Sequence, residues 1–193
     1  MPWHKNYDKT QVLEKAMKAF WCHGYEGTSI NDLVAATGIN RGSIYASFPN
    51  KHALFICALR YYDQKYRARH LERLAAAHSP REAITAVFAE AAKKPQDEDI
   101  PWGCLLVNTA LELSPHDIEV SKLVDHSLKC VEAFFVERIE AAQQEGSIRQ
   151  SIDSFTTAKG LLSLFLGLRV LTRANASRTT IDAVTSQARV MLD

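Results

Sequence analysis

Long apolar runs are missing from this chain of 193 residues. No uninterrupted hydrophobic stretch approaches the roughly 18 residues that a membrane span needs. Residues 1–5 also lack the apolar core and the cleavage site of a secretory signal. We therefore expect a cytoplasmic protein without membrane contact.

Strand-like alternation of apolar and polar residues is missing as well. Apolar residues recur instead at spacings of three and four, which is typical of helices. The hydrophobic content of 47% and the charged content of 23% are those of a globular protein. The sequence therefore predicts an all-α fold.

Cysteine is scarce, and its four copies lie far apart in the sequence. They are Cys22, Cys57, Cys104 and Cys130. No two of them have the short spacing of zinc ligands, and no histidine cluster accompanies them. We expect free thiols in a reducing compartment, no metal site and no cofactor.

An excess of one charge sign is absent from the whole chain, whose formal net charge is +1, but the charges are unevenly distributed. Residues 1–73 carry 11 Lys and Arg against 6 Asp and Glu, whereas residues 74–193 carry 12 against 16. A basic N-terminal part favours contact with nucleic acid. The asymmetry is modest and would also fit a solvated surface.

Caps and breakers divide the chain into a series of predicted helices. Glycine after a periodic segment ends a helix, and Ser, Asn or Asp before one begins it. The predicted helices are Lys9–His23, Ser29–Thr37, Asn40–Phe48, Lys51–Ala77, Arg81–Lys93, Trp102–Leu113, His116–Glu145, Phe155–Arg173 and Thr179–Leu192.

The second and third predicted helices are short and are joined by a tight turn, Gly38-Ile39-Asn40. Ser29 and Asp32 have the spacing of a capping box at the start of the second helix. Two short helices around a glycine-containing turn describe a helix-turn-helix, whose second helix enters the major groove of DNA. The alternative is a plain three-helix bundle with polar helix ends.

The predicted recognition helix carries side chains suited to DNA. Arg41 can donate two hydrogen bonds to guanine, and Gly42 removes bulk where the backbone approaches DNA. Hydroxyl, amide and ammonium groups suit phosphates or base edges, and a helix N-terminus itself favours a phosphate. The other predicted DNA contacts are Thr28, Ser29, Asn40, Ser43, Tyr45, Ser47 and Lys51. We expect Phe48 to pack in the core instead.

Residues 24–30, 36–40 and 42–55 resemble the N-terminal domain of TetR-type repressors, over a match that covers about residues 8–55. His52 stands where an acidic residue is more usual. The resemblance implies a DNA-binding domain at 1–52 and an effector-binding and dimerisation domain at 53–193. It further implies a regulator, most simply a repressor, that leaves a palindromic double-stranded operator when a small-molecule effector binds.

The resemblance also implies a homodimer formed through the last two helices, at about 153–193. These helices are rich in apolar and small residues, which a lone subunit covers poorly. The residues in question are Gly160, Leu161, Leu164, Phe165, Gly167, Leu168, Leu171, Ile181, Val184, Ala188 and Met191. The alternative is that they form the core of a monomer.

The motif Gly103-Cys104-Leu105 opens a predicted helix. The positive end of a helix favours a thiolate. The motif resembles a branch of the family that responds to electrophiles or small acids, and Arg173 stands where an electrophile-sensing member has a supporting lysine. The alternative for Cys104 is a small buried apolar residue.

Residues near the motif are candidates for an effector pocket, although plain core packing would explain each of them too. Besides Cys104 and Arg173, the candidates are Trp102, Asn108, Phe134 and Phe165.

Two other functions remain open at this level. Cys104 as nucleophile with His116 as base and Asp117 as orienting acid would make a hydrolase, but Asp117 is also an ordinary helix cap, and we expect no enzyme. An architectural DNA-binding protein without a ligand is the other alternative, and the large C-terminal part speaks against it.

Overall fold

The computed structural model describes residues 7–94 and 103–193, and these residues form helices and connecting turns without strands. The all-α prediction is therefore confirmed. The helical elements are α1 Lys9–His23, α2 Ile30–Thr37, α3 Arg41–Ser47, α4 Lys51–Tyr62, the π-helical segment η1 Asp63–Ala68, α5 Arg69–Ala77, α6 Pro80–Ala91, α7 Leu105–Glu112, α8 Ile118–Gln144, α9 Ser154–Arg173 and α10 Arg178–Val190.

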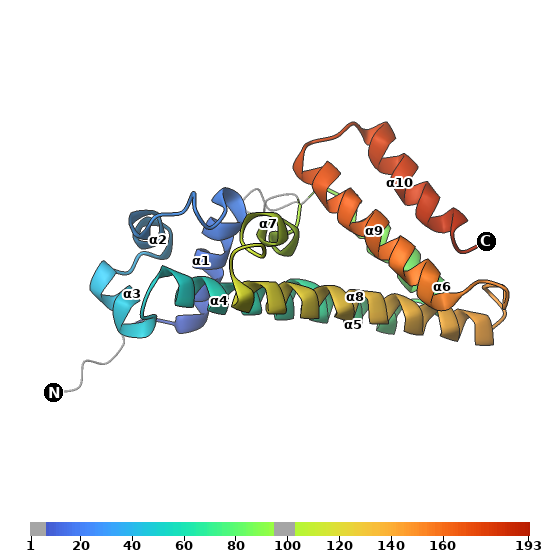
Figure 1. The fold of residues 1–193 in the computed structure, drawn as a ribbon, viewed down its shortest axis with the longest axis horizontal. Helices are drawn as coiled ribbons and strands as arrows, with labels where there is room; N and C mark the ends of the chain where they lie inside the picture. Colours follow the sequence, from blue (N-terminus) through green and yellow to red (C-terminus); the bar gives the residue numbers. More distant parts are fainter. Residues whose placement is uncertain (1–6, 95–102) are drawn as a thin grey trace.

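The molecule is elongated, with a group of helices at each end (Figure 1). Helices α1, α2 and α3 gather at the N-terminal end, and α6, α9 and α10 gather at the other. The continuous path of α4, η1 and α5 runs along the long axis, as does α8. Helix α7 lies between the two ends and contacts α1, α4, α8 and α9.

The caps at the N-terminal end form as the sequence predicts. Ser29 and Asp32 form the capping box, in which the Ser29 hydroxyl accepts from the Asp32 N–H at 3.2 Å and the Asp32 carboxylate accepts from the Ser29 N–H at 2.8 Å. The Asn40 amide oxygen accepts from the N–H of Ser43 at 2.8 Å. Gly38 ends α2 in the left-handed conformation, at φ 75°, which glycine adopts without strain. These local bonds hold α2 and α3 at a fixed turn.

Two helix predictions need correction. The predicted uninterrupted α-helix over 51–77 is instead α4, η1 and α5, because residues 63–68 widen into π-helical turns. Such turns are rare and are frequently found at functional sites. The helix predicted from Trp102 begins at Leu105; Trp102 itself lies outside the described residues.

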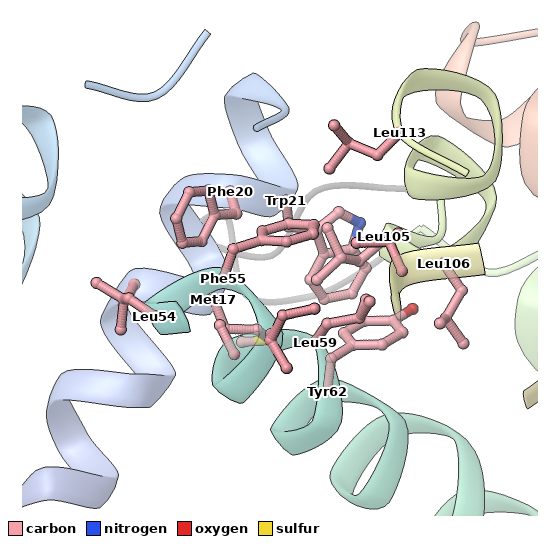
Figure 2. Packing of buried hydrophobic residues seen from close by; sticks show 14 of the residues in the cluster. Met17, Phe20, Trp21, Leu54, Phe55, Leu59, Tyr62, Leu105, Leu106 and Leu113 are labelled. Carbon is pink, nitrogen blue, oxygen red and sulfur yellow. The ribbon is translucent and has the colours of Figure 1, made fainter. Parts of the chain in front are cut away.

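Two buried clusters divide the interior. The first joins α1 and α4 to α7, with Trp21, Phe55 and Leu105 among its members, and it also takes in Val120 of α8 (Figure 2). The second lies among α5, α6, α8, α9 and α10, around Phe88. The first cluster therefore includes residues from both sides of the predicted boundary at residues 52 and 53, and that boundary falls inside α4.

Helix α9 is long and apolar enough to cross a membrane by length and composition alone, although most of it is not buried within the single chain. Counting uninterrupted apolar runs misses it, because Gly, Ser and Thr residues separate the apolar ones. One side packs on α8 and α10. Phe155 and Val170 remain exposed on the surface, as does Val190 of α10.

Candidate DNA-binding face and effector cavity

Helix α3 has a clear inner and outer face. Ile44 and the following Phe48 are buried, at 0% and 2% exposure, so the predicted core position of Phe48 is confirmed. Arg41, Gly42 and Tyr45 are exposed. The outer face therefore presents the residues that the sequence assigns to DNA.

Local contacts order this outer face. The Arg41 guanidinium lies 5.9 Å from the centre of the Tyr45 ring. The Tyr7 hydroxyl donates to the Ser43 carbonyl at 3.2 Å and shares a short hydrogen bond with the Ser47 hydroxyl. A Cβ atom at Gly42 would lie 3.3 Å from the Asn40 amide oxygen that caps the helix. A side chain at position 42 would therefore require the capping Asn40 side chain to shift by a few tenths of an ångström.

The predicted DNA contact of the Thr28 side chain is wrong for this conformation. Thr28 is fully buried, and its hydroxyl donates to the Gly24 carbonyl at 2.6 Å. Ser29, one residue later, is exposed at the start of α2. The contact of Ser29 with a phosphate stays a prediction, while Thr28 holds the preceding loop together through its bond to Gly24.

Lys51 has an internal structural role that the sequence did not reveal. Its ammonium group donates to the carbonyls of Tyr25, at 3.0 Å, and Thr28, at 3.2 Å, and lies 4.1 Å from the centre of the Tyr25 ring. The side chain is half-buried. Its contact with phosphate stays a prediction, and Lys51 joins α4 to the loop that precedes α2.

Two carboxylates tie this end to the following helices. Glu112, the last residue of α7, accepts from the N–H groups of Tyr25 at 3.0 Å and Glu26 at 2.8 Å. Gly24 makes the approach possible, because a Cβ atom there would lie 2.8 Å from a Glu112 oxygen. Nothing in the sequence marks Glu112, since its partners are 86 and 87 residues away.

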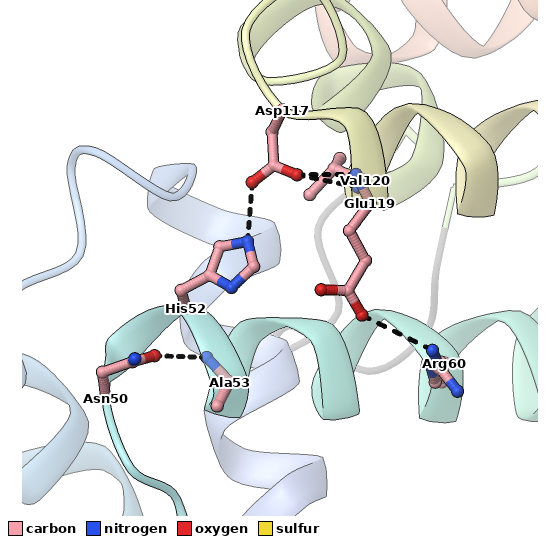
Figure 3. Close-up of polar contacts among 7 residues, drawn as sticks. All are labelled: Asn50, His52, Ala53, Arg60, Asp117, Glu119 and Val120. Atoms are coloured by element: carbon pink, nitrogen blue, oxygen red, sulfur yellow. Dashed lines mark hydrogen bonds and ion pairs between the residues drawn. The ribbon is translucent and has the colours of Figure 1, made fainter.

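The second carboxylate, Asp117, is paired with His52 across the two predicted domains (Figure 3). The His52 Nε2 and Asp117 Oδ2 atoms are 2.6 Å apart. Hydrogen bonds from the N–H of Val120 and from His52 lower the pKa of Asp117. Beside this pair, Arg60 and Glu119 form an exposed ion pair at 3.6 Å. The unusual His52 therefore has a partner that sequence reasoning did not supply.

A cavity of about 410 Å³ lies where the two buried clusters meet. Every element from α4 to α9, and α1 as well, contributes to its wall. Of the predicted pocket residues, Cys104 and Phe165 line it, whereas Asn108, Phe134 and Arg173 do not. Phe134 instead packs edge-on against Phe135.

Cys104 is buried in the cavity wall as the N-cap of α7, and all four cysteines are free thiols. The Tyr62 hydroxyl donates to its sulfur at 3.4 Å. Burial, and then the proximity of Cys104, raise the pKa of Tyr62 well above its usual value. The phenol therefore stays protonated and able to donate.

On α9, Arg169 rather than the predicted Arg173 lines the cavity, to which η1 also contributes Arg67. Arg169 lies one helical turn before Arg173 on α9 and donates a short hydrogen bond to the Gly103 carbonyl. Arg173 turns to the Cys22 carbonyl, at 2.7 Å. The spacing of four residues could have suggested Arg169, because such positions share one helix face.

Known proteins share the N-terminal and the C-terminal part of this chain. A family model for "Bacterial regulatory proteins, tetR family" matches residues 12–57, and one for a "Tetracyclin repressor-like, C-terminal domain" matches residues 80–188. The uncharacterized HTH-type transcriptional regulator YezE of Bacillus subtilis is 32% identical over 90% of each chain. The HTH-type transcriptional repressor ComR of Escherichia coli is 33% identical over 90% of this chain and 83% of its own.

A solved structure also matches nearly the whole chain. A cysteine mutant of the TetR family transcriptional regulator CifR, complexed with 26-base-pair operator DNA, superposes with a TM-score of 0.84 at 28% identity, over 96% of this chain and 97% of CifR. The match therefore spans both domains of the fold. The chain therefore belongs to the TetR family of bacterial regulatory proteins.

Proposed function

We propose that this protein is a cytoplasmic transcriptional repressor that binds a palindromic operator as a homodimer and leaves it when a small molecule fills the cavity. The exposed face of α3, with Arg41, Gly42 and Tyr45, would read and contact DNA in the major groove. Ser29 and Lys51 would contact the phosphates on either side.

The observation that carries this proposal is the position of α7. Its N-cap Cys104 and its residues Leu106 and Val107 line the cavity, and its last residue, Glu112, holds the loop that leads into α2. A ligand that binds more tightly to one position of α7 would therefore change the position of α2 and α3. The loss of DNA affinity would equal the ligand's differential affinity for the two arrangements.

The dimer would form through α9 and α10. Phe155, Val170 and Val190 are exposed large apolar side chains on these helices. Other members of the predicted interface are already covered within one subunit, including Leu161, Leu168 and Ile181. A two-fold dimer would place its recognition helices on half-sites about one helical turn, roughly 34–36 Å, apart.

The hydrolase alternative has little support. Asp117 caps α8 and pairs with His52. His116 is exposed and follows the C-terminal end of α7, whereas Cys104 precedes the N-terminal end of the same helix. The relatives named above are described as transcriptional regulators. The ligand-free architectural alternative leaves the cavity without a role.

Selection of DNA from a random duplex library by the purified protein tests the proposal. We expect an inverted repeat to be enriched, and its affinity to fall steeply with salt because phosphate contacts release counterions. The control is Tyr45→Ala, which should weaken binding and leave the dimer intact in sedimentation. Enrichment of no sequence, or of a single half-site by a monomer, would contradict the proposal.

A further inference from the structure

Two buried N–H donors in the cavity wall have no partner among the described residues. They are Trp21 Nε1 and Arg169 Nε. Trp21 is only 2% exposed, and its ring packs edge-on against Tyr62 and Tyr66, with centroids 4.9 and 5.4 Å away. Indole and guanidinium groups donate hydrogen bonds and accept none. A ligand that reaches these two groups must therefore bring acceptor atoms.

The charged side chains of the wall also favour a ligand with acceptor atoms. Four Lys or Arg side chains line the cavity, against Glu90 as the one carboxylate among the described lining residues. Glu90 is already bonded to Arg73, at 2.5 Å, and Arg67 is bonded to Asp63. Arg169 has no ion pair within the described part of the chain.

The field of Arg169 reaches other groups in the wall. Its guanidinium opposes the rise in the pKa of Tyr62 that burial produces. Burial lowers the pKa of His70; the Glu90 carboxylate opposes this effect, whereas Arg73 and Arg169 add to it. Arg169 therefore supplies a positive charge inside the wall. Lys93 and Lys94 add exposed positive charge at the cavity.

The rest of the wall is apolar and partly aromatic. The rings of Tyr62 and Tyr66 stack with centroids 5.2 Å apart, and Leu106, Val107 and Phe165 contribute further apolar surface. Flat faces of this kind suit an aromatic or similarly planar body. A volume of about 410 Å³ is within the usual range for small-molecule sites.

We propose that the cavity binds a ring-bearing carboxylate, whose anionic group is held by Arg169 and Trp21 Nε1 and whose apolar body lies against Tyr62, Tyr66 and Phe165. The proposal rests on the proposed function, in which this cavity is the effector site, and it names the class of effector. Carboxylate and guanidinium form charge-assisted hydrogen bonds that a neutral ligand does not replace.

Calorimetry with two matched probe pairs tests the proposal: 1-naphthoate against 1-naphthamide, and 3-phenylpropanoate against its amide. We expect each carboxylate to bind the wild-type protein at least about tenfold more tightly than its amide. Arg169→Gln should bring that ratio close to one. Arg169→Lys, which keeps the charge, should retain a preference for the carboxylate.

The matched control is Arg173→Gln, the same change one helical turn away and outside the cavity, which should keep the full ratio. Equal binding of amide and carboxylate by the wild type, or an unchanged ratio in Arg169→Gln, would overturn the proposal. Binding of neither probe class would overturn it too. If Arg169→Gln does not fold, the carboxylate-to-amide affinity ratios of the wild type and of Arg169→Lys test the proposal.

Operator binding by the same samples separates this proposal from the proposed function. Intact DNA binding without carboxylate preference contradicts only the ligand class. A carboxylate that binds tightly and leaves operator affinity unchanged supports the ligand class and contradicts effector-driven release.

Discussion

Helices α3 and α7 are nearly equal in length, at seven and eight residues, but they act in opposite ways. Helix α3 buries Ile44 and exposes its polar face, so its chemistry is on the surface. Helix α7 buries Leu105, Leu106, Val107 and Thr109 between other helices. In the proposed function, α3 would act through its exposed side chains, whereas α7 would act through its position between the cavity and the loop before α2.

The sharpest test of this contrast is a core substitution in α7. Leu105→Ala should reduce the free energy of unfolding by about 2–5 kcal/mol, because Leu105 is 2% exposed and its loss leaves a cavity. Denaturant unfolding measures the change. Leu111→Ala on the same helix, at 74% exposure, is the control and should change stability by less than about 0.5 kcal/mol. Equal effects would contradict the buried role of α7.

A substitution on the outer face of α3 should weaken DNA binding without lowering the free energy of unfolding. Arg41→Ala should cost about 1–3 kcal/mol of operator binding and relax the preference at one base pair per half-site. Fluorescence anisotropy on operators with single base changes measures both effects. Arg173→Ala, far from α3, is the control. Unchanged base preference in Arg41→Ala would remove Arg41 as a reader.

Glu112 joins α7 to the loop that leads into α2. Glu112→Gln removes the charge that accepts two main-chain N–H bonds, and hydrogen bonds to charged groups contribute about 1.5–3 kcal/mol each. We expect amide exchange at Tyr25 and Glu26 to become about tenfold faster, which corresponds to about 1.4 kcal/mol of local opening. Nuclear magnetic resonance can follow these amides.

Glu119→Gln serves as the control for Glu112→Gln, because it removes a nearby but exposed ion pair with Arg60. It should leave exchange at Tyr25 and Glu26 unchanged. Wild-type exchange rates in Glu112→Gln would show that α7 does not hold the loop.

The smallest effect is expected at the His52–Asp117 pair. Because hydrogen bonds lower the pKa of Asp117 in the folded protein, its stabilising contribution is complete above the ordinary carboxyl pKa of about 4. That contribution is lost as the pH falls through the lower folded pKa. Asp117→Asn should therefore flatten the acid limb of the stability profile below about pH 4, and cost less than about 1 kcal/mol at pH 7 because the pair is partly exposed.

Thermal unfolding across pH measures this effect, with the exposed Asp125→Asn as the control. An acid limb that is identical in wild type and Asp117→Asn would mean that the pair contributes nothing to stability.

Local signals made the DNA-binding end predictable. Ser29, Asn40 and Gly38 act within three or four residues, so their caps follow from the sequence alone. The cavity was less predictable, because its wall combines α1 with every element from α4 to α9. Asn108 and Phe134 have suitable chemistry but face elsewhere, while Trp21 and Arg169 were missed.

The sequence by itself determined most of the helices, the caps of α2 and α3, the helix-turn-helix and the outer face of α3, because each depends on residues close together in the chain. It did not reveal the π-helical turns at 63–68 or the start of α7 at Leu105. Only the tertiary structure decided that Thr28 is buried, that Glu112 and Asp117 hold the N-terminal end, and that Arg169 reaches the cavity. These facts depend on contacts between distant segments. The direction of a side chain in such contacts follows from how whole helices pack, which local periodicity does not encode.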